Sequence, residues 1–355
     1  MNKILTPYAK GALNLKNHLV MAPMTRSRAI DNLPNKLMVE YYTQRAGAGL
    51  IITEGTSPTL NGLGYPRIPG IFSQTQIDGW KAVTDAVHAH NSKIFIQLMH
   101  TGRIGHLDNL PEGAELVGAS DIKAAGQIHT DKSGMQDHSA PKAMTTEGVK
   151  EIIAGHVTAA KNAIAAGFDG IELHGANGYL IEQFLNPNVN NRTDEYGGSI
   201  AGRTKMVIEM ARDIAAAIGK DKVGIRFSPY NKLGDLTAYP ENEIHETYMH
   251  LATELNKIGI AYIHIGRTPD AQQKTIDAIR AAFNGTIILC NGFTPETAEA
   301  MLNSGAADLI AFGRPFLANP DFDKRIAANA AMAQPDFTLL FTPGPKGYID
   351  YPALA

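Results

Sequence analysis

Three polar side chains stand close together where a short apolar segment of the sequence ends. Residues 170–173, GIEL, are followed by His174, Asn177 and Tyr179, with glycines between them. An imidazole, a carboxamide and a phenol on one turn can all form hydrogen bonds with a single small ligand. Each also has a purely structural interpretation, as a satisfied polar residue at a strand end, an Asn-Gly turn and a partly buried amphipathic ring. Their grouping makes this turn a candidate functional site.

Two more polar residues interrupt apolar segments. Arg226 lies within VGIRFS (223–228) and Gln97 lies within KIFIQL (93–98). A buried guanidinium needs anions or acceptors around it. Arg226 therefore predicts either an internal ion pair with a glutamate of a neighbouring strand or a ligand of anionic or carbonyl character. The carboxamide of Gln97 carries both a donor and an acceptor, which suits a heterocycle with adjacent C=O and N–H groups.

The segments that carry these residues belong to a repeating pattern of short apolar runs, each followed by a stretch of helical periodicity. Continuous apolar runs are typical of parallel strands that are buried on both faces. Eight of them occur, at residues 18–23, 49–55, 93–98, 170–175, 223–228, 261–265, 286–290 and 309–313. Alternation of strand and helix leaves an open doubly wound sheet or a closed barrel. Eight regular units favour an α/β fold with a single (β/α)8 TIM barrel over residues 1–355, whose strand ends carry the catalytic groups.

Three local features refine this prediction. Residues 11–20 are expected to form an N-terminal hairpin that closes the bottom of the barrel. Residues 101–144 form a long excursion after the third strand, and because loops of that length are often functional, we expect a lid. Helix N-caps are expected at Thr146 and at Thr294, the latter followed by Pro295 in the first turn.

The last two predicted strands end in the glycine-containing turns NGF and FGRPFL. Loops after the seventh and eighth strands form the usual phosphate site of a TIM barrel. Gly292 and Gly313 would let backbone N–H groups approach a phosphate, and Arg314 would add positive charge. Two tight turns that simply need glycine are the alternative. The sequence has no G-x-G-x-x-G dinucleotide fingerprint, so a mononucleotide such as FMN fits a site with a phosphate at one edge and a heterocycle at its centre.

Composition narrows the function class. Of the 355 residues 44% are hydrophobic and 19% charged, and the formal net charge is −3, which gives no reason to expect a nucleic acid or a membrane as partner. Neither a signal peptide nor an apolar run long enough for a transmembrane helix is recognisable. The single cysteine, Cys290, excludes a disulfide framework and any multi-cysteine zinc or iron–sulfur site. We therefore expect a cytoplasmic protein with no bound metal.

Other function classes fit parts of the sequence. A metal-dependent TIM-barrel hydrolase could use the strand-end histidines His100, His174 and His264 as zinc ligands, although no pair of histidines ends the first strand. A glycosidase could use Glu54 and Glu172 as its carboxylate pair. A non-catalytic flavin-binding module is a third alternative. The complete group of polar side chains on the turn after the fourth strand argues against it.

Over nearly its whole length the sequence resembles the old yellow enzymes, FMN-dependent ene-reductases built on a TIM barrel. The segments that carry the resemblance are APMTRSR, EYYTQRAGAGLIITEGT, GYPRIPGIFS, IFIQLMHTGRIGH, GFDGIELHGANGYLIEQFLNP, NNRTDEYGGSI, GIRFSP, FGRPFLANPD and GYIDYP. The resemblance implies FMN as cofactor and NAD(P)H as reductant in a ping-pong reaction. A hydride passes from NAD(P)H to FMN and then to the β-carbon of an activated alkene such as an enone, a maleimide or a nitroalkene, and nitrate esters are further expected substrates.

The resemblance also implies roles for individual residues. His174 and Asn177 are expected to bind the substrate oxygen, and Tyr179 is expected to donate the proton. Thr25 is expected to act catalytically by lying near the flavin O4, where a donor tunes the reduction potential. The residues expected to bind the cofactor are Pro23, Met24, Thr25, Gly55, Gln97, His174, Arg226, Asn291, Gly292, Gly313 and Arg314.

Some positions distinguish this chain within the family that it resembles. Met99 stands where many members have tryptophan, so Met99 and Tyr65 should form a softer wall of the substrate pocket. Asn177 stands where some members have a second histidine, and Thr25 stands where another branch has cysteine. The expected partners are small α,β-unsaturated carbonyl or nitro compounds, and the expected state is a monomer or a weak homo-oligomer.

Overall fold

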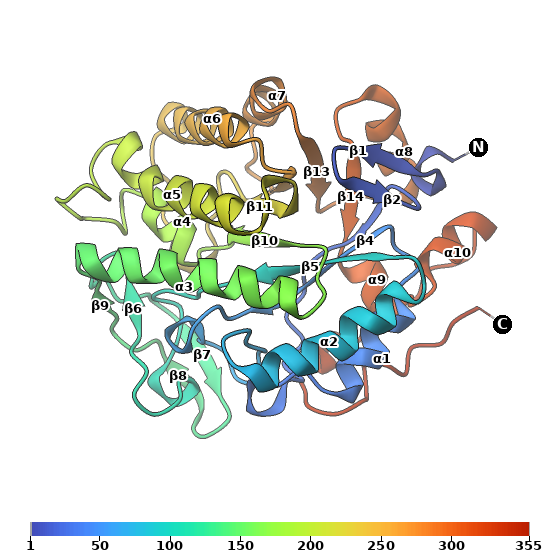
Figure 1. The fold of residues 1–355 in the computed structure, drawn as a ribbon, viewed down its shortest axis with the longest axis horizontal. Coiled ribbons are helices and arrows are strands. Elements are labelled where there is room, and N and C mark those ends of the chain that lie inside the picture. Colours follow the sequence, from blue (N-terminus) through green and yellow to red (C-terminus); the bar gives the residue numbers. More distant parts are fainter. Residues whose placement is uncertain (1, 355) are drawn as a thin grey trace.

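The computed structural model describes residues 2–354, and its centre is a closed barrel of parallel strands (Figure 1). The barrel strands are β3 (Leu19–Met21), β4 (Leu50–Thr56), β5 (Lys93–Leu98), β10 (Gly170–Gly175), β11 (Val223–Phe227), β12 (Tyr262–Gly266), β13 (Thr286–Cys290) and β14 (Leu309–Phe312). They are hydrogen-bonded in chain order, and β14 closes the circle against β3. The predicted (β/α)8 TIM barrel is confirmed, and every predicted strand overlaps an observed one.

Helices surround the barrel. Those that follow the strands in the repeating units are α1 (Lys36–Gln44), α2 (Gln74–His88), α3 (Thr146–Ala165), α5 (Ile200–Ile218), α6 (Glu241–Ile258), α7 (Gln273–Ala282) and α8 (Pro295–Ser304). Shorter additions are α4 (Leu180–Leu185) after β10, and α9 (Arg314–Ala318) and α10 (Phe322–Ala328) after β14. The predicted cap at Thr294 is confirmed, with its side chain accepting from the backbone N–H of Thr297.

The predicted cap at Thr146 is wrong by one residue. Thr145 has the extended backbone of an N-cap, and its side chain accepts from the N–H of Gly148 at 3.0 Å. Thr146 is already helical, and its hydroxyl donates to Asp194 at 2.7 Å. The two threonines are adjacent, and only the backbone conformation distinguishes the cap from the first helical residue.

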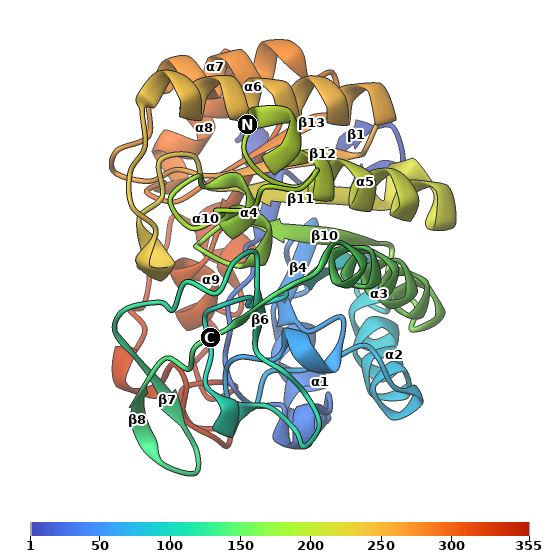
Figure 2. The same ribbon diagram turned by 90° about the vertical axis from the view of Figure 1, so that its left-hand side faces the viewer.

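The two ends of the barrel are covered differently. At one end, β1 (Tyr8–Lys10) and β2 (Leu13–Leu15) form an antiparallel hairpin whose apolar residues pack against the interior of the barrel. The hairpin is thus confirmed, but it spans residues 8–15 and not 11–20, because residues 19 and 20 belong to β3. At the opposite end, the 101–144 excursion contains β6 (Val117–Gly118), the hairpin β7 (Gln127–Thr130) and β8 (Gly134–Asp137), and β9 (Lys142–Ala143) (Figures 1 and 2).

The barrel interior has two layers of different character. Side chains alternate along a strand, so Ile171 and Leu173 of β10 pack toward the helices while Glu172 and His174 face the barrel axis. Near the N-terminal hairpin the interior is filled by apolar side chains, including Val20, Leu50, Ile52, Phe95, Tyr262, Ile288 and Leu309. Toward the carboxyl ends of the strands the interior becomes polar. The fold therefore places an apolar floor beneath a polar layer.

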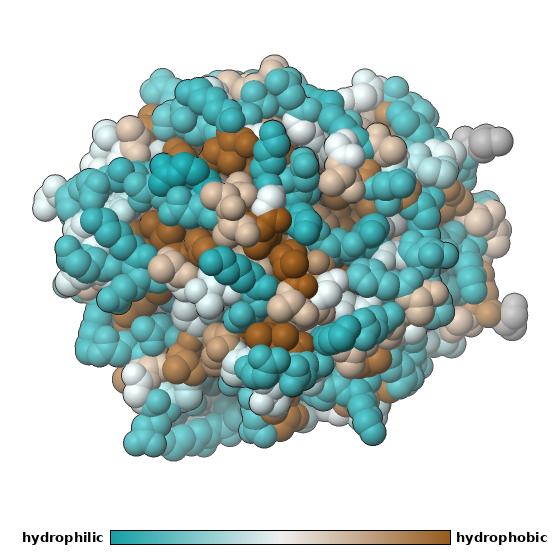
Figure 3. Space-filling view, viewed as in Figure 1, coloured by the Kyte–Doolittle hydropathy of each residue, from teal (hydrophilic) through white to brown (hydrophobic). Residues whose placement is uncertain are grey.

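The outer surface is mostly polar on the face shown in Figure 3, where apolar side chains gather in small groups between polar ones. Within residues 2–354, no helix is long and apolar enough to cross a membrane.

Candidate active site

Strand register assembles the predicted polar residues into one layer. Gln97 of β5 is paired with Glu172 of β10. Two residues further along β10, His174 is paired with Arg226 of β11, which is itself paired with His264 of β12. Because the strands are parallel, these side chains all lie near the carboxyl ends of their strands, where TIM-barrel enzymes carry their active sites.

Glu172 organises part of this layer. Its Oε1 accepts from Gln97 Nε2 at 2.8 Å, its Oε2 accepts from His264 Nδ1 at 2.9 Å, and all three side chains are buried. Burial by itself lowers the pKa of His264, but the carboxylate of Glu172 raises it, and the pKa lies above its ordinary value. Because the NH2 group of Gln97 is bonded to Glu172, its carbonyl oxygen is left to accept a hydrogen bond.

Arg226 has no such partner. The residue is only 6% exposed, and its buried Nε has no hydrogen-bond partner within residues 2–354. The internal ion pair considered for Arg226 is therefore absent from the described chain, because the carboxylate of Glu172 on the adjacent strand is bonded to Gln97 and His264. Of the two interpretations offered by the sequence, the structure favours a guanidinium that binds an anionic or carbonyl ligand.

His174 presents a neutral N–H group. Its Nδ1 accepts from the backbone N–H of Ala176 at 3.3 Å, so the ring proton lies on Nε2. Burial, together with the charges of Arg226 and His264, holds the pKa of His174 well below its ordinary value. The ring packs edge-on against Tyr179, with 4.8 Å between centroids. His174 is thus a fixed hydrogen-bond donor over the physiological pH range.

The turn after β10 brings Asn177 and Tyr179 beside His174. Asn177 has a left-handed backbone with φ of 58°, and its side chain has no hydrogen-bond partner within the described residues. The hydroxyl of Tyr179 donates to the hydroxyl of Tyr65 at 3.2 Å. Burial and the neighbouring Tyr65 raise the pKa of Tyr179 well above its ordinary value, so the phenol keeps its proton.

A cavity of about 700 Å3 joins several predicted residues. Thr25, Tyr65 and Tyr179 line it on the barrel side. The rest of its wall consists of Ser27, Pro66 and Arg67, the β7–β8 hairpin, and residues 338–343 near the C-terminus. Residues of the 101–144 excursion thus line one side of the cavity, and a lid function for the excursion stays a prediction.

Met99 lies behind this wall and does not line the cavity itself. It is 1% exposed and forms a small apolar cluster with Leu63 and Ile68, against which Tyr65 and Tyr179 pack. Met99 also covers Gly55, since a Cβ at Gly55 would lie 2.4 Å from the Met99 sulfur. Met99 thus supports the two tyrosines from behind.

The predicted phosphate residues lie on two adjacent turns. Cys290 of β13 is paired with Ala311 of β14, so the turns that follow these strands lie side by side. In the first turn, Asn291 and Gly292 are exposed and both have positive φ, 75° and 76°. Gly313 begins the second turn at the N-terminus of α9.

Two further predicted residues border the second of these turns. A Cβ at Gly313 would lie 3.4 Å from the sulfur of Met24, so Met24 packs beside it. Arg314 is exposed, and its guanidinium stacks on Phe337 at 5.2 Å. The guanidinium of Arg314 is thus held at the surface beside the turn, where solvent can reach it.

The model of the NADH:flavin oxidoreductase / NADH oxidase family matches residues 3–332. The chain belongs to this family. Among its relatives, 12-oxophytodienoate reductase 7 of Oryza sativa subsp. japonica is 38% identical over 99% of this chain and 94% of its own sequence. For 12-oxophytodienoate reductase 2 of Arabidopsis thaliana the identity is 36%, over 99% and 96%.

Solved structures of family members agree with the fold. Morphinone reductase matches with a TM-score of 0.95 at 39% identity, covering all of this chain and 97% of its own. The old yellow enzyme homologue from Zymomonas mobilis matches with a TM-score of 0.94 at 35% identity, covering 99% and 100%. The chain is an old yellow enzyme, an FMN-dependent NAD(P)H ene-reductase, and the predicted recognition, fold and enzyme class are confirmed.

The polar layer fits the cofactor of the family. The flavin ring of FMN carries carbonyl groups next to an N–H group. The free guanidinium of Arg226 can donate to such carbonyl oxygens, and the free carbonyl of Gln97 can accept from the N–H. At the phosphate end, Gly292 has no atom within 4 Å of where a Cβ would stand, so its backbone is open to a ligand.

Sequence reasoning missed the arginines that hold the cavity walls. Arg26 donates to the carbonyl of Gly347 at 2.6 Å, and Arg28 donates to that of Leu339 at 2.8 Å, so both fix the C-terminal segment. Arg67 donates to the carbonyl of Phe341 at 2.9 Å and also forms an ion pair with Asp131 in the β7–β8 turn. The arginines of APMTRSR and GYPRIPG were visible in the sequence, but their partners are far away along the chain.

The hydrolase and glycosidase alternatives are not supported. Among residues 2–354, no group of three or more His, Cys, Asp or Glu side chains is arranged to hold a metal ion. Glu54 accepts from the backbone N–H of Arg26 and from the hydroxyl of Tyr42, whereas Glu172 is bonded to Gln97 and His264. Each carboxylate is thus part of a separate structural network.

Proposed function

We propose that the chain reduces activated alkenes at the turn that follows β10. The observation that carries this proposal is the grouping of two free hydrogen-bond donors, His174 Nε2 and the Asn177 carboxamide, with the protonated phenol of Tyr179. We propose enones, maleimides, nitroalkenes and nitrate esters as substrates. The names of the relatives, reductases of 12-oxophytodienoate and of morphinone, support a small organic substrate.

His174 and Asn177 hold the substrate oxygen in this proposal. Negative charge develops on that oxygen as the alkene is reduced, and an oriented donor to such an oxygen contributes about 2.7–4 kcal/mol in other enzymes. The neutral state of His174 suits this role, since a fixed N–H group stabilises the developing charge without giving up its proton.

Tyr179 supplies the proton to the α-carbon. Its raised pKa keeps it protonated until the reaction, and a positioned weak acid can still protonate a carbon that carries developing charge. Tyr65 accepts from the Tyr179 hydroxyl at 3.2 Å and thereby orients it. Bound FMN would supply the hydride chemistry, taking a hydride from NAD(P)H and returning it to the β-carbon of the substrate.

The cofactor is held along the polar layer in this proposal. Arg226 and Gln97 would bind the polar edge of the flavin ring, and Thr25 would donate to its O4. The ring would also contact Pro23, Met24, Gly55 and His174, and the phosphate would be held by Asn291, Gly292, Gly313 and Arg314. We also propose a cytoplasmic monomer or weak homo-oligomer, supported by the single cysteine and by the mostly polar face in Figure 3.

Two measurements test the proposal. The purified protein should show the visible absorption of bound flavin, and a colourless protein that gains no flavin on reconstitution would refute it. Tyr179→Phe should slow the reduction of a weakly activated enone by about 10²–10⁴-fold while leaving the reduction of the flavin by NAD(P)H nearly unchanged. Tyr196→Phe, which alters a tyrosine bonded to Glu209 on α5, is the matched control. Equal losses in both half-reactions of Tyr179→Phe would contradict the proton-donor role.

A further inference from the structure

The carboxamide of Asn177 is free to bind a substrate, so its position depends on how the backbone of its turn is held. Asn177 and Gly178 both have positive φ, 58° and 83°, a conformation that a turn keeps only when its surroundings fix it. The backbone N–H of Asn177 donates to the hydroxyl of Ser228 at 2.9 Å. Ser228 follows the last residue of β11, so the end of a neighbouring strand holds the turn in position.

Glu182 holds this turn in two ways. It lies in the first turn of α4 and is 4% exposed. Its Oε2 accepts directly from the backbone N–H of Gly178 at 2.7 Å. Its Oε1 accepts from the hydroxyl of Ser228 at 2.9 Å, and the same hydroxyl receives the N–H of Asn177. One carboxylate thus fixes two consecutive residues of the turn.

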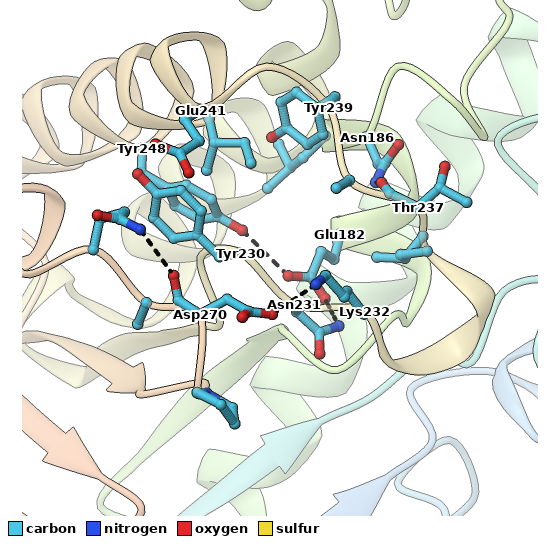
Figure 4. A pocket seen from close by; sticks show the side chains of 17 residues that line it. Glu182, Asn186, Tyr230, Asn231, Lys232, Thr237, Tyr239, Glu241, Tyr248 and Asp270 are labelled. Carbon is cyan, nitrogen blue, oxygen red and sulfur yellow. Dashed lines mark hydrogen bonds and ion pairs between the residues drawn. The ribbon is translucent and has the colours of Figure 1, made fainter.

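Two more donors fix the carboxylate from its other side. Asn231 Nδ2 donates to Oε2 at 2.9 Å and the hydroxyl of Tyr248 on α6 donates to Oε1 at 3.2 Å (Figure 4). These residues line a second cavity, of about 360 Å3, which shares no lining residue with the cavity at Tyr179. Lys232 also lines this cavity, and it forms an ion pair with Asp270 at 2.8 Å.

The four partners favour a carboxylate at this position over an amide. The N–H of Gly178 and the NH2 of Asn231 both point at Oε2. A glutamine would have an NH2 group in place of one of the two carboxylate oxygens, each of which accepts from two donors. An NH2 in the Oε2 position would face the N–H of Gly178 and the NH2 of Asn231, and an NH2 in the Oε1 position would require the hydroxyls of Ser228 and Tyr248 to accept instead of donate. In both orientations the hydrogen bonds that hold the turn are rearranged. Burial raises the pKa of Glu182 to about 7, although the four hydrogen bonds act in the opposite direction.

We propose that Glu182 is a positioning residue for Asn177: by holding Gly178 directly and Asn177 through Ser228, it sets the orientation of the carboxamide that binds the substrate oxygen. This inference rests on the proposed function, since it assigns Glu182 to the oxygen-holding site. Glu182 does not contact the substrate. It acts only through the turn, and the second cavity is the space behind it.

The test measures the affinity of the FMN-loaded protein for a phenol, whose oxygen can take the place of the substrate oxygen. Binding of 4-chlorophenol is followed by the change in flavin absorbance in Glu182→Gln, Asn177→Ala and the double variant. Glu182→Gln should raise the dissociation constant by about 10-fold, the effect of one misplaced hydrogen bond. In the Asn177→Ala background it should change the constant by less than 2-fold, because the carboxamide that Glu182 orients is gone.

Several outcomes decide the matter. An unchanged affinity in Glu182→Gln, or an equal loss in the presence and absence of the Asn177 side chain, would overturn the proposal. If Asn177→Ala itself leaves phenol binding unchanged, the oxygen-holding role fails first, which separates the two hypotheses. Glu209→Gln alters a partly buried glutamate far along α5 and should leave the affinity as it was.

A second variant covers the case in which Glu182→Gln does not fold. Ser228→Ala removes only the link between Glu182 and Asn177, leaving the bonds from Gly178, Asn231 and Tyr248 in place. It should weaken phenol binding in the same direction and show the same dependence on the Asn177 side chain. Wild-type affinity in Ser228→Ala would overturn the proposal without any result from Glu182→Gln.

Discussion

The unpaired guanidinium of Arg226 leads to a prediction in which stability and cofactor binding change in opposite directions. Arg226 is 6% exposed, and its buried Nε has no hydrogen-bond partner among the described residues. A buried polar group without a partner costs about 1–3 kcal/mol, and a charged group costs more. Arg226→Met keeps an unbranched side chain of similar reach and removes the charge. The free energy of unfolding of the FMN-free protein should therefore rise by about 1–3 kcal/mol.

The same substitution should weaken FMN binding. A hydrogen bond from a charged donor contributes about 1.5–3 kcal/mol, so the loss of Arg226 should raise the dissociation constant of FMN roughly 10- to 150-fold. Urea unfolding of the FMN-free protein gives the first quantity. Titration of that protein with FMN, followed by quenching of the flavin fluorescence, gives the second.

Arg45 is the matched control, because it is also buried but fully paired. Its guanidinium donates to the carbonyls of Phe316 at 2.8 Å and of Leu317 at 2.7 Å, among others. Arg45→Met leaves these carbonyls buried without a donor and should destabilise the protein by about 3 kcal/mol or more, with or without FMN. If Arg226→Met lowers the stability of the FMN-free protein as Arg45→Met does, then Arg226 has partners that the structure does not show, and the reasoning is refuted.

Three other predictions follow from buried groups. Burial raises the pKa of Glu54 from 4.5 to about 7, so its contribution to stability is greatest below pH 4.5 and is lost as the pH rises through 7, by on the order of 3 kcal/mol. In Glu54→Gln, the free energy of unfolding measured in urea should therefore depend less on pH between pH 5 and 8. An unchanged pH dependence of this free energy would contradict the prediction. Gly55→Ala places a Cβ 2.4 Å from the Met99 sulfur and should lower the melting temperature. Adding Met99→Ala should recover part of this decrease in melting temperature. Strictly additive decreases in the double variant would show that the contact between the new Cβ and Met99 is not the cause. His264→Leu removes the imidazole that donates to the buried Glu172 side chain and should cost about 3–5 kcal/mol in urea unfolding, whereas a loss below 1 kcal/mol would show that this contact does not stabilise the fold.

The barrel strands could be predicted closely because buried parallel strands leave a direct signal in the sequence. Segments such as 170–175 and 223–228 are apolar except where a residue faces the barrel axis, and the observed strands begin and end at nearly the same positions. The β7–β8 hairpin left no such signal. Its strands are short and half exposed, and their polar residues are indistinguishable from those of a loop.

The candidate residues were visible in the sequence, but their partners were not. Whether Arg226 was half of an ion pair or a ligand-binding group depended on what Glu172 was bonded to, and that depends on the register of four strands. The role of Glu182 also requires the structure, since its four partners come from segments between residues 178 and 248. Pairing across the barrel is a property of the fold as a whole, and a local sequence pattern carries no information about it.

Within the polar layer, hydrogen-bond partners separate the framework from the binding surface. Gln97 and His264 both donate to Glu172, which holds the two side chains in place. Arg226, in the same layer, has no partner, and neither the His174 Nε2 nor the Asn177 side chain has one within the described chain. A folded protein rarely leaves such groups unpaired at the end of a packed barrel unless a ligand completes them. Arg226, His174 and Asn177 are therefore expected to contact the cofactor and substrate, as is the remaining carbonyl oxygen of Gln97, while Glu172 determines where these contacts are made.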